Sequence, residues 1–330
     1  MSNDADPPHA AVALEYISPE ELELDPANPV GPELMMWCSL VLGAVALDPS
    51  RTLLVISGDF VASVRDRLEP GLREKYTTVR NDGTVGAKTM ARPDGSVHVV
   101  IPADWFKAAL IVDEPEQFES IVKRTIAHEA FHVAMIQAGE AESLFESEPH
   151  ARRNFLVSAE EVISEFRAET AVAPELRAGD VPWDTIEALR SLRASLARIA
   201  AEYQVHGDEN ALEQGIFHEC HIAWKVLALV ALELRDFETG AIGTPPESVT
   251  SHYLWLRMAA DQWGPFTDIL ATVPPGSHRI GRSTLYSRAA ELADVLNDWL
   301  KLLGFHWVDL EDGHSFTVRS WDLLRPEDGR

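Results

Sequence analysis

The stretch ESIVKRTIAHEAFHVAMIQ, residues 119–137, determines how the rest of the chain is interpreted. It contains neither glycine nor proline, and its apolar residues recur at three- and four-residue intervals, which predicts one amphipathic helix. Gly139, two residues further on, is a good helix terminator. At about 100° per residue, His128, Glu129 and His132 fall on the apolar side of this helix. That side also carries Ile121, Val122, Thr125, Val133 and Ile136.

The pentapeptide His128-Glu129-Ala130-Phe131-His132 fits the H-E-x-x-H pattern of metal-dependent hydrolases. Histidines four residues apart on a helix project one above the other, so both imidazoles can bind one metal ion. The alternative is that His128, Glu129 and His132 are buried side chains that only hydrogen-bond to their neighbours. Burying three titratable side chains without a metal costs several kcal/mol, however. The pattern therefore predicts a Zn²⁺ site with His128 and His132 as ligands and Glu129 as the general base.

A catalytic zinc site takes three protein ligands and leaves one position for water, so a third donor is needed. Residues 158–169 read as another helix, and three glutamates follow one flank of it at four-residue steps. These are Glu161, Glu165 and Glu169. Glu165 and Glu169 lie closest to the apolar face, but neighbours at this spacing reach similar places. All three are candidate ligands on this ground alone.

At this point the sequence resembles the gluzincin metallopeptidases, in which a glutamate of an E-x-x-A-[D/E] pattern on the next helix completes the site. Residues 165–169, EFRAE, match that pattern. The resemblance implies that Glu165 is the third ligand, with Glu161 as the alternative. It also implies that Glu169 is a carboxylate that orients a ligating histidine. No H-x-x-G-x-x-H continuation follows, which argues against the metzincin arrangement.

In motif layout, about residues 50 to 175 are similar to minimal zincins such as the ImmA/IrrE-like regulatory proteases, which often accompany a helix-turn-helix partner. Residues 95–102 are rich in β-branched side chains and bounded by turn residues, which predicts a strand. Further strand candidates are 52–57 and 75–80, with turn signals at 81–83 and 93–95. The resemblance implies that the strand before the active helix is an edge strand that borders the cleft and pairs with an extended substrate.

We therefore expect an α+β fold: a zincin-like small mixed sheet packed on the H-E-x-x-H helix over residues 33–178. Six prolines before residue 33 predict an extended or partly ordered leader, residues 1–32. A Gly/Pro break near residues 179–182 predicts a large, mainly helical C-terminal half, residues 179–330. Its expected elements are helices at 183–203, 211–236, 247–263 and 283–303, then a β-hairpin within 305–321.

Composition excludes several classes of protein. At 330 residues and 46% hydrophobic content, the chain can bury a substantial core and is not disordered. The formal net charge of −25 disfavours nucleic acid and anionic membranes as partners. The apolar stretch 34–47 is shorter than the roughly 20 residues that span a bilayer, which favours a buried core helix.

Two cysteines, Cys38 and Cys220, are too few for a disulfide framework. The first 25 residues contain no lysine or arginine, so they lack the charged region of a signal peptide. These features favour a cytoplasmic protein. We expect a peptide or protein substrate and allow for a regulatory protein partner.

The apolar helix expected around residues 216–234 carries the polar cluster His218-Glu219-Cys220-His221. Three interpretations remain open for it: a second metal site, an oxyanion-stabilising role for His218 or His221, or ordinary helix packing. The other candidates for the oxyanion role are Tyr203, His206, His252 and Tyr253, whereas His150 is expected in a loop.

The leading functional hypothesis is a zinc metallopeptidase that hydrolyses peptide bonds with a metal-activated water. The alternative is a non-catalytic zincin-fold protein that binds a peptide or another protein and holds a structural metal. An intact Glu129 counts against this alternative, because a structural metal needs no general base.

Overall fold

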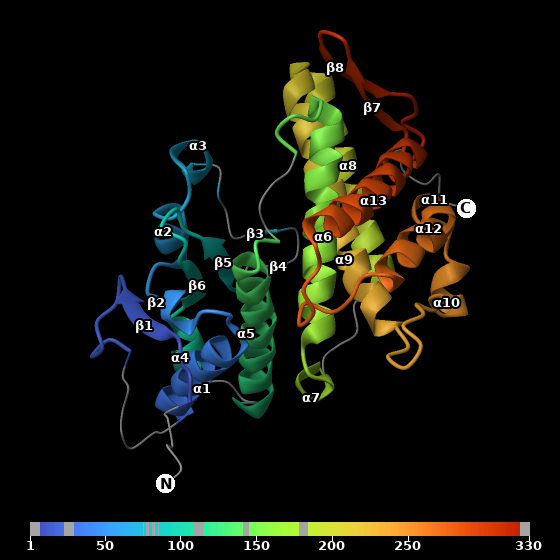
Figure 1. Ribbon diagram of the computed structural model, residues 1–330. Coiled ribbons are helices and arrows are strands. Elements are labelled where there is room, and N and C mark those ends of the chain that lie inside the picture. The colour runs from blue at the N-terminus through green and yellow to red at the C-terminus, as the bar shows by residue number, and fades with distance from the viewer. Residues whose placement is uncertain are drawn as a thin grey trace. The chain divides into compact units, whose positions relative to one another are not determined.

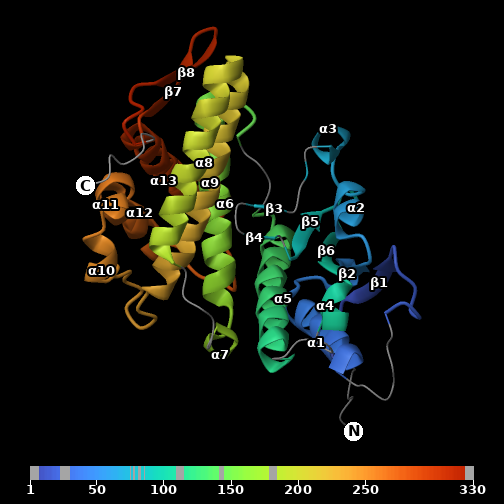
Figure 2. The same ribbon diagram turned by 180° about the vertical axis from the view of Figure 1, so that it is seen from behind.

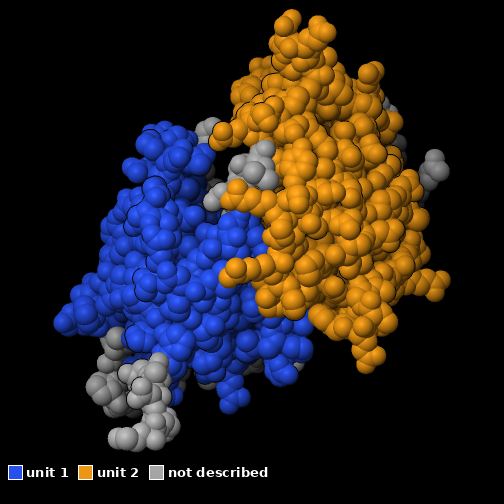
Figure 3. Space-filling view, in the orientation of Figure 1, with its two compact units in different colours: residues 1–142, 171–180 blue, residues 143–170, 181–330 orange. Residues whose placement is uncertain are grey.

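The computed structural model forms two compact units, residues 1–142 with 171–180 and residues 143–170 with 181–330 (Figure 3). The residues that it describes are 7–22, 30–74, 76, 79–80, 83–84, 86–108, 115–140, 145–177 and 184–323. The division differs from the expected boundary at residue 178, because helix α6 (His150–Ala171), except for its last residue, belongs to the second unit. Its buried side chains, among them Phe155 and Phe166, join the core of that unit.

The first unit is built on a mixed four-stranded sheet with the strand order β1-β2-β6-β5. Strands β1 (Ala11–Glu15), β2 (Thr52–Ser57) and β6 (Val97–Pro102) are parallel, whereas β5 (Lys88–Ala91) runs antiparallel to β6. The strand predicted at residues 52–57 is confirmed at both ends. The expectation of a small mixed sheet is also confirmed.

The position of β6 corrects one prediction. We expected the strand before the active helix to be an edge strand, but β6 lies between β2 and β5. The edge on that side is β5, which is joined to β6 through a turn that contains Gly95 at φ +81°. Glycine adopts this left-handed backbone without the steric cost that a side chain would bring. The short sequence KTMA of β5 has too little alternation to predict a strand.

The expected leader also takes part in this fold. Residues 11–15 form β1, which pairs with β2 in the register Ala11↔Leu53 to Glu15↔Ser57. Ala10 and Leu22, on either side of β1, are buried in the same core as the sheet. Prolines around this short strand favoured an extended segment, but did not show that its backbone pairs with the sheet.

One further strand prediction is only partly covered. Within residues 75–80 the structure has β3 (Val79–Arg80), which pairs antiparallel with β4 (Gly83–Thr84). Lys75, Thr77 and Thr78 lie outside the described residues, as do the predicted turn residues Asn81 and Asp82.

Helices α1 (Val30–Val45) and α5 (Pro115–Gln137) pack together against one face of the sheet (Figure 1). Alternate residues of β2 and β6 join that core, whereas Val55 and Val100 point to the opposite face and meet α2 (Phe60–Arg65). This alternation follows from the two-residue period of a strand. The predicted core helix at 34–47 is confirmed by α1, in which Cys38 is fully buried and burial raises the pKa of its thiol to about 12. The shorter elements of this unit are η1 (Pro49–Arg51), α3 (Pro70–Arg73), α4 (Asp104–Ala108) and α7 (Pro174–Arg177).

Helix α5 confirms the predicted helix and is fixed at its C-terminal end. The backbone N–H of Gly139, at φ +76°, donates to the carbonyl of Ile136 at 2.9 Å, which is a common way to end a helix. The side-chain amide of Gln137 accepts from the N–H of Asp48 and donates to its carbonyl, both at 3.0 Å. This pair of bonds ties the end of α5 to the segment that leads into β2.

The second unit is mainly helical, as expected. Helices α8 (Thr185–His206) and α9 (Glu209–Glu233) run side by side, and α13 (Arg282–Leu302) leads into the hairpin of β7 (Phe305–Leu310) and β8 (Gly313–Val318) (Figure 2). The predicted hairpin is confirmed.

One long helix predicted at 247–263 is wrong, because the chain breaks there into α10 (Glu247–Thr250), α11 (Tyr253–Met258) and the start of α12 (Ala260–Ala271). The ring of His252 accepts a hydrogen bond from the N–H of Leu254 at 3.2 Å and so begins a new helix at that point.

Among the described residues, α9 is the one helix that is long and apolar enough to cross a membrane by length and composition. Its buried side chains, including Cys220, Trp224 and Leu227, are part of the core of the second unit. Packing within the protein therefore accounts for its apolar character.

Glu160 on α6 gives this unit a pH-dependent stability. Burial, reinforced by the neighbouring Glu161 carboxylate, raises the pKa of Glu160 from 4.5 to about 7. The folded protein then binds more protons than the unfolded chain between these two values, so the free energy of unfolding falls as the pH rises through this window. We expect Glu160→Gln to stabilise the protein by about 1 to 3 kcal/mol at pH 8. The gain should shrink toward pH 5 in urea unfolding, and the exposed control Glu238→Gln should show no such trend.

Candidate metal centre

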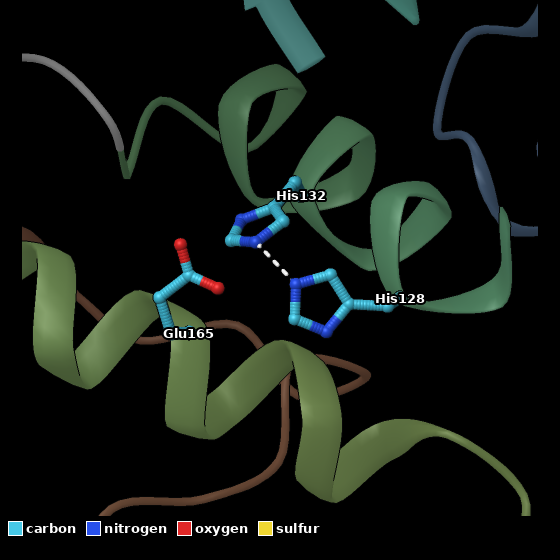
Figure 4. A group of neighbouring side chains, drawn as sticks. All are labelled: His128, His132 and Glu165. Atoms are coloured by element: carbon cyan, nitrogen blue, oxygen red, sulfur yellow. Dashed lines mark hydrogen bonds between the residues drawn. The ribbon is translucent and has the colours of Figure 1, made fainter. Parts of the chain in front are cut away.

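His128 and His132 lie one turn apart on α5, with both side chains on the same side of the helix (Figure 4). Their Nε2 atoms are 3.0 Å apart, and the ring centroids are 4.7 Å apart at an interplanar angle of 70°. Both residues are half-buried. Two nitrogen donors thus converge on one point beside the helix, as the four-residue spacing predicts.

This geometry fits a bound metal ion. Tetrahedral zinc with bonds of about 2.0 to 2.1 Å to nitrogen keeps neighbouring donor atoms about 3.3 to 3.4 Å apart. The two Nε2 atoms at 3.0 Å need only a small rotation of the rings to reach that separation. Without a metal ion, the same contact would be a hydrogen bond between the two rings, with one nitrogen as donor and the other as acceptor. Such a hydrogen bond gives Glu129 no role.

The structure places Glu129 in a buried position against the sheet. Its side chain is 9% exposed, and the hydroxyl of Thr89 on β5 donates to its Oε2 atom at 2.5 Å. The edge strand β5 therefore holds the carboxylate that the H-E-x-x-H pattern identifies as a base. Sequence reasoning missed Thr89 because it did not predict β5, although the turn signal at residues 93–95 indicated that a strand precedes β6 in a hairpin.

The inward face predicted for α5 is confirmed at Val122 and Val133 but not at Ile121. Val122, Ile126 and Val133 are buried in the core between α5 and the sheet. Ile121 is 45% exposed, so its predicted burial is wrong. It lies almost directly below His128, seven residues earlier, on the more open flank of the helix.

Glu165, the predicted third ligand, lies on α6 in the second unit and is also drawn in Figure 4. Its Oε1 atom is 2.8 Å from Nζ of Lys225 on α9. Glu161, the alternative ligand, places Oε2 3.0 Å from Nε2 of His221 and 3.9 Å from the same lysine. Glu169 is buried. The role of each glutamate toward a metal stays a prediction, and Lys225 is a neighbour of the carboxylate row that the sequence did not reveal.

The polar cluster on α9 spreads in several directions. Cys220 is fully buried in the core, and burial raises the pKa of its thiol. His221 contacts Glu161, whereas an oxygen of Glu219 lies 3.8 Å from Arg198. Among the described residues, these side chains therefore do not converge on one metal position.

The oxyanion candidates all belong to the second unit. His252 begins α11, and the Tyr253 hydroxyl accepts from Arg193 at 3.0 Å, so both have structural partners. His206 is exposed at the end of α8. His150 is the first residue of α6 rather than a loop residue, so that expectation is wrong.

No protein-family model, curated protein or solved structure matches this chain.

Thr89→Val tests whether the contact to Glu129 positions the carboxylate. We expect this nearly isosteric change to reduce any hydrolytic activity that depends on Glu129 about tenfold, because the carboxylate loses the hydroxyl that fixes its rotamer. Thr89→Ser keeps the hydroxyl and should restore most of the activity. Equal losses in the two variants, measured as kcat/KM, would show that Thr89 contributes only packing.

Proposed function

We propose that this chain is a zinc-dependent metallopeptidase of gluzincin type, with His128 and His132 as metal ligands and Glu129 as the general base. One observation carries the proposal: two Nε2 atoms on α5 converge at 3.0 Å, and the glutamate between these histidines in the sequence is buried and accepts a hydrogen bond from a sheet hydroxyl. If His128 and His132 served only in packing, the protein would not need Glu129 to be held in a fixed orientation.

Zinc, when bound, supplies a Lewis acid that polarises the scissile carbonyl and increases the acidity of a water molecule. The carboxylate of Glu129 accepts a proton from the attacking water and passes it to the leaving amine. Thr89 keeps the oxygens of this carboxylate oriented for both transfers. We assign Glu165 as the third ligand and Glu169 as the carboxylate that orients a ligating histidine, following the E-x-x-A-E pattern.

The edge of the sheet offers a way to hold an extended substrate. β5 has a hydrogen-bonded neighbour only on its β6 side among the described strands, and Thr89 on this strand contacts Glu129. A peptide that pairs with the outer side of β5 through main-chain hydrogen bonds would pass close to the base. The substrate in this proposal is a peptide or an unfolded protein segment in the cytoplasm, and a regulatory protein partner is compatible with it.

The proposal is tested with the purified chain and a fluorescence-quenched peptide library. We expect hydrolysis that a chelator removes and added zinc restores, and that Glu129→Gln lacks. If the wild type binds zinc yet cleaves no library peptide and no denatured protein, a non-catalytic zincin-fold binding protein replaces the peptidase.

A further inference from the structure

A second group of metal-ligating side chains lies wholly within the second unit. His150 at the start of α6, Glu213 near the start of α9 and His314 on β8 each offer one ligand atom, and these atoms lie within 4.8 Å of one another. The three residues are far apart in the sequence, so no linear motif indicates the site. We propose that His150, Glu213 and His314 form a second site for a divalent transition-metal ion of the zinc class.

Both histidines contact the carboxylate of Glu213. Nε2 of His314 is 3.0 Å from Oε2 of Glu213, and Nε2 of His150 is 3.6 Å from Oε1 of the same carboxylate. A tetrahedral zinc ion keeps its donors about 3.3 to 3.4 Å apart, so these ligand atoms, which lie within 4.8 Å of one another, would come closer together on binding it. At 3.6 Å, the contact between Nε2 of His150 and Oε1 of Glu213 is too long for a hydrogen bond. Hydrogen bonding between these three side chains therefore uses only Oε2 of the carboxylate.

The charges also favour a cation. Glu213 is 9% exposed, and its ion-pair partners among the described residues are these two histidines, with no lysine or arginine beside it. The two imidazole rings are stacked, with centroids 4.2 Å apart at 16°. A divalent cation is attracted by this buried carboxylate and can bind the imidazole nitrogens beside it.

The fold positions these ligands with specific contacts. On β7, the carboxylate of Asp309 accepts from the backbone N–H groups of Ala151 at 2.7 Å and Arg152 at 2.9 Å, and so caps α6 next to His150. Asp309 is the Cα partner of His314 in the hairpin. The residue pair Asp309 and His314 of the hairpin therefore both caps α6 and places His314 near His150.

The indole ring of Trp307 packs against both imidazole rings. Trp307 packs edge-on against His150 at 5.5 Å and His314 at 6.1 Å, and it also contacts Phe155 and Phe217. Apolar surroundings strengthen the binding of a metal ion by excluding water from one side of the site. Two histidines and one glutamate also form a ligand set that zinc uses when a fourth position stays open.

The site joins the β7–β8 hairpin to two helices that are far from it in the sequence. A metal ion bound there would stabilise the folded state relative to the unfolded chain, in which the three ligands are far apart. This inference does not depend on the proposed peptidase function, because none of its residues belongs to that site.

The test uses the full-length chain with His132→Ala as the background, which removes the first site. After equilibrium dialysis against Zn²⁺ and elemental mass spectrometry, we expect one zinc per chain in this background. Adding His314→Ala should weaken zinc binding at least about 100-fold, whereas adding His306→Ala, a histidine of the same hairpin outside the cluster, should leave it unchanged. Equal zinc binding in the two double variants would overturn the proposal.

Glu213→Gln provides a second variant, which keeps the size of the side chain and one acceptor oxygen but removes the negative charge. We expect this variant, in the same background, to fold normally by circular dichroism but to lose the rise in Tm that Zn²⁺ produces. If Glu213→Gln keeps the full zinc-dependent rise in Tm, the three residues form only a hydrogen-bond network.

Discussion

Glu129→Gln is expected to abolish peptide hydrolysis while the protein still binds zinc. The glutamine amide cannot accept the proton of the attacking water, and loss of a general base lowers rates by about 100- to 10,000-fold. Since the amide has nearly the same shape as the carboxylate, the buried position against Thr89 should remain filled. We expect kcat to fall at least about 1,000-fold, with little change in KM or in the free energy of unfolding.

The matched control for this variant is Glu116→Gln, an exposed glutamate in the first turn of the same helix. It should retain wild-type activity. If Glu129→Gln keeps more than a tenth of the wild-type kcat, Glu129 does not act as the general base.

His132→Ala is expected to have the largest effect on metal binding at the first site. It removes one of two nitrogen donors that lie 3.0 Å apart, so the remaining ligands cannot hold the ion in the same geometry. We expect the affinity of this site for zinc to fall at least about 1,000-fold and the stabilisation that zinc gives to this site to disappear. The Glu213→Gln background removes the second site. Calorimetric zinc titration with and without His132→Ala in this background therefore measures the first site alone.

His206→Ala serves as the control, because His206 is an exposed histidine on α8. In the Glu213→Gln background it should bind zinc as tightly as the parent. Unchanged affinity in His132→Ala would instead assign the histidine pair on α5 to packing or mutual hydrogen bonding.

Local patterns were sufficient to predict several elements. The 3.6-residue period and Gly139 defined α5, and β2 matched its predicted range because its apolar run is bounded by turn residues. The proximity of the two histidines could be predicted from spacing alone, since residues four apart on a helix are neighbours on its surface.

Features that depend on tertiary pairing could not be predicted in this way. β5 is too short to show a period, so neither its edge position nor the contact of Thr89 with Glu129 was visible in the sequence. Amphipathicity predicts that α6 has a buried face but not which core covers it, and this helix joined the second unit. The cluster around Glu213 depends on a helix, a second helix and a hairpin meeting, which no single stretch of sequence encodes.

The most direct test of the proposed metal site is a crystal structure of the zinc-loaded protein with anomalous diffraction measured at the zinc absorption edge. We expect an anomalous peak about 2.0 to 2.1 Å from Nε2 of His128 and Nε2 of His132, with an oxygen of Glu165 as the third protein ligand. A peak near Glu213 would concern only the second site. Absence of a peak at the histidine pair of α5, in crystals that contain zinc elsewhere or not at all, would contradict the metallopeptidase proposal.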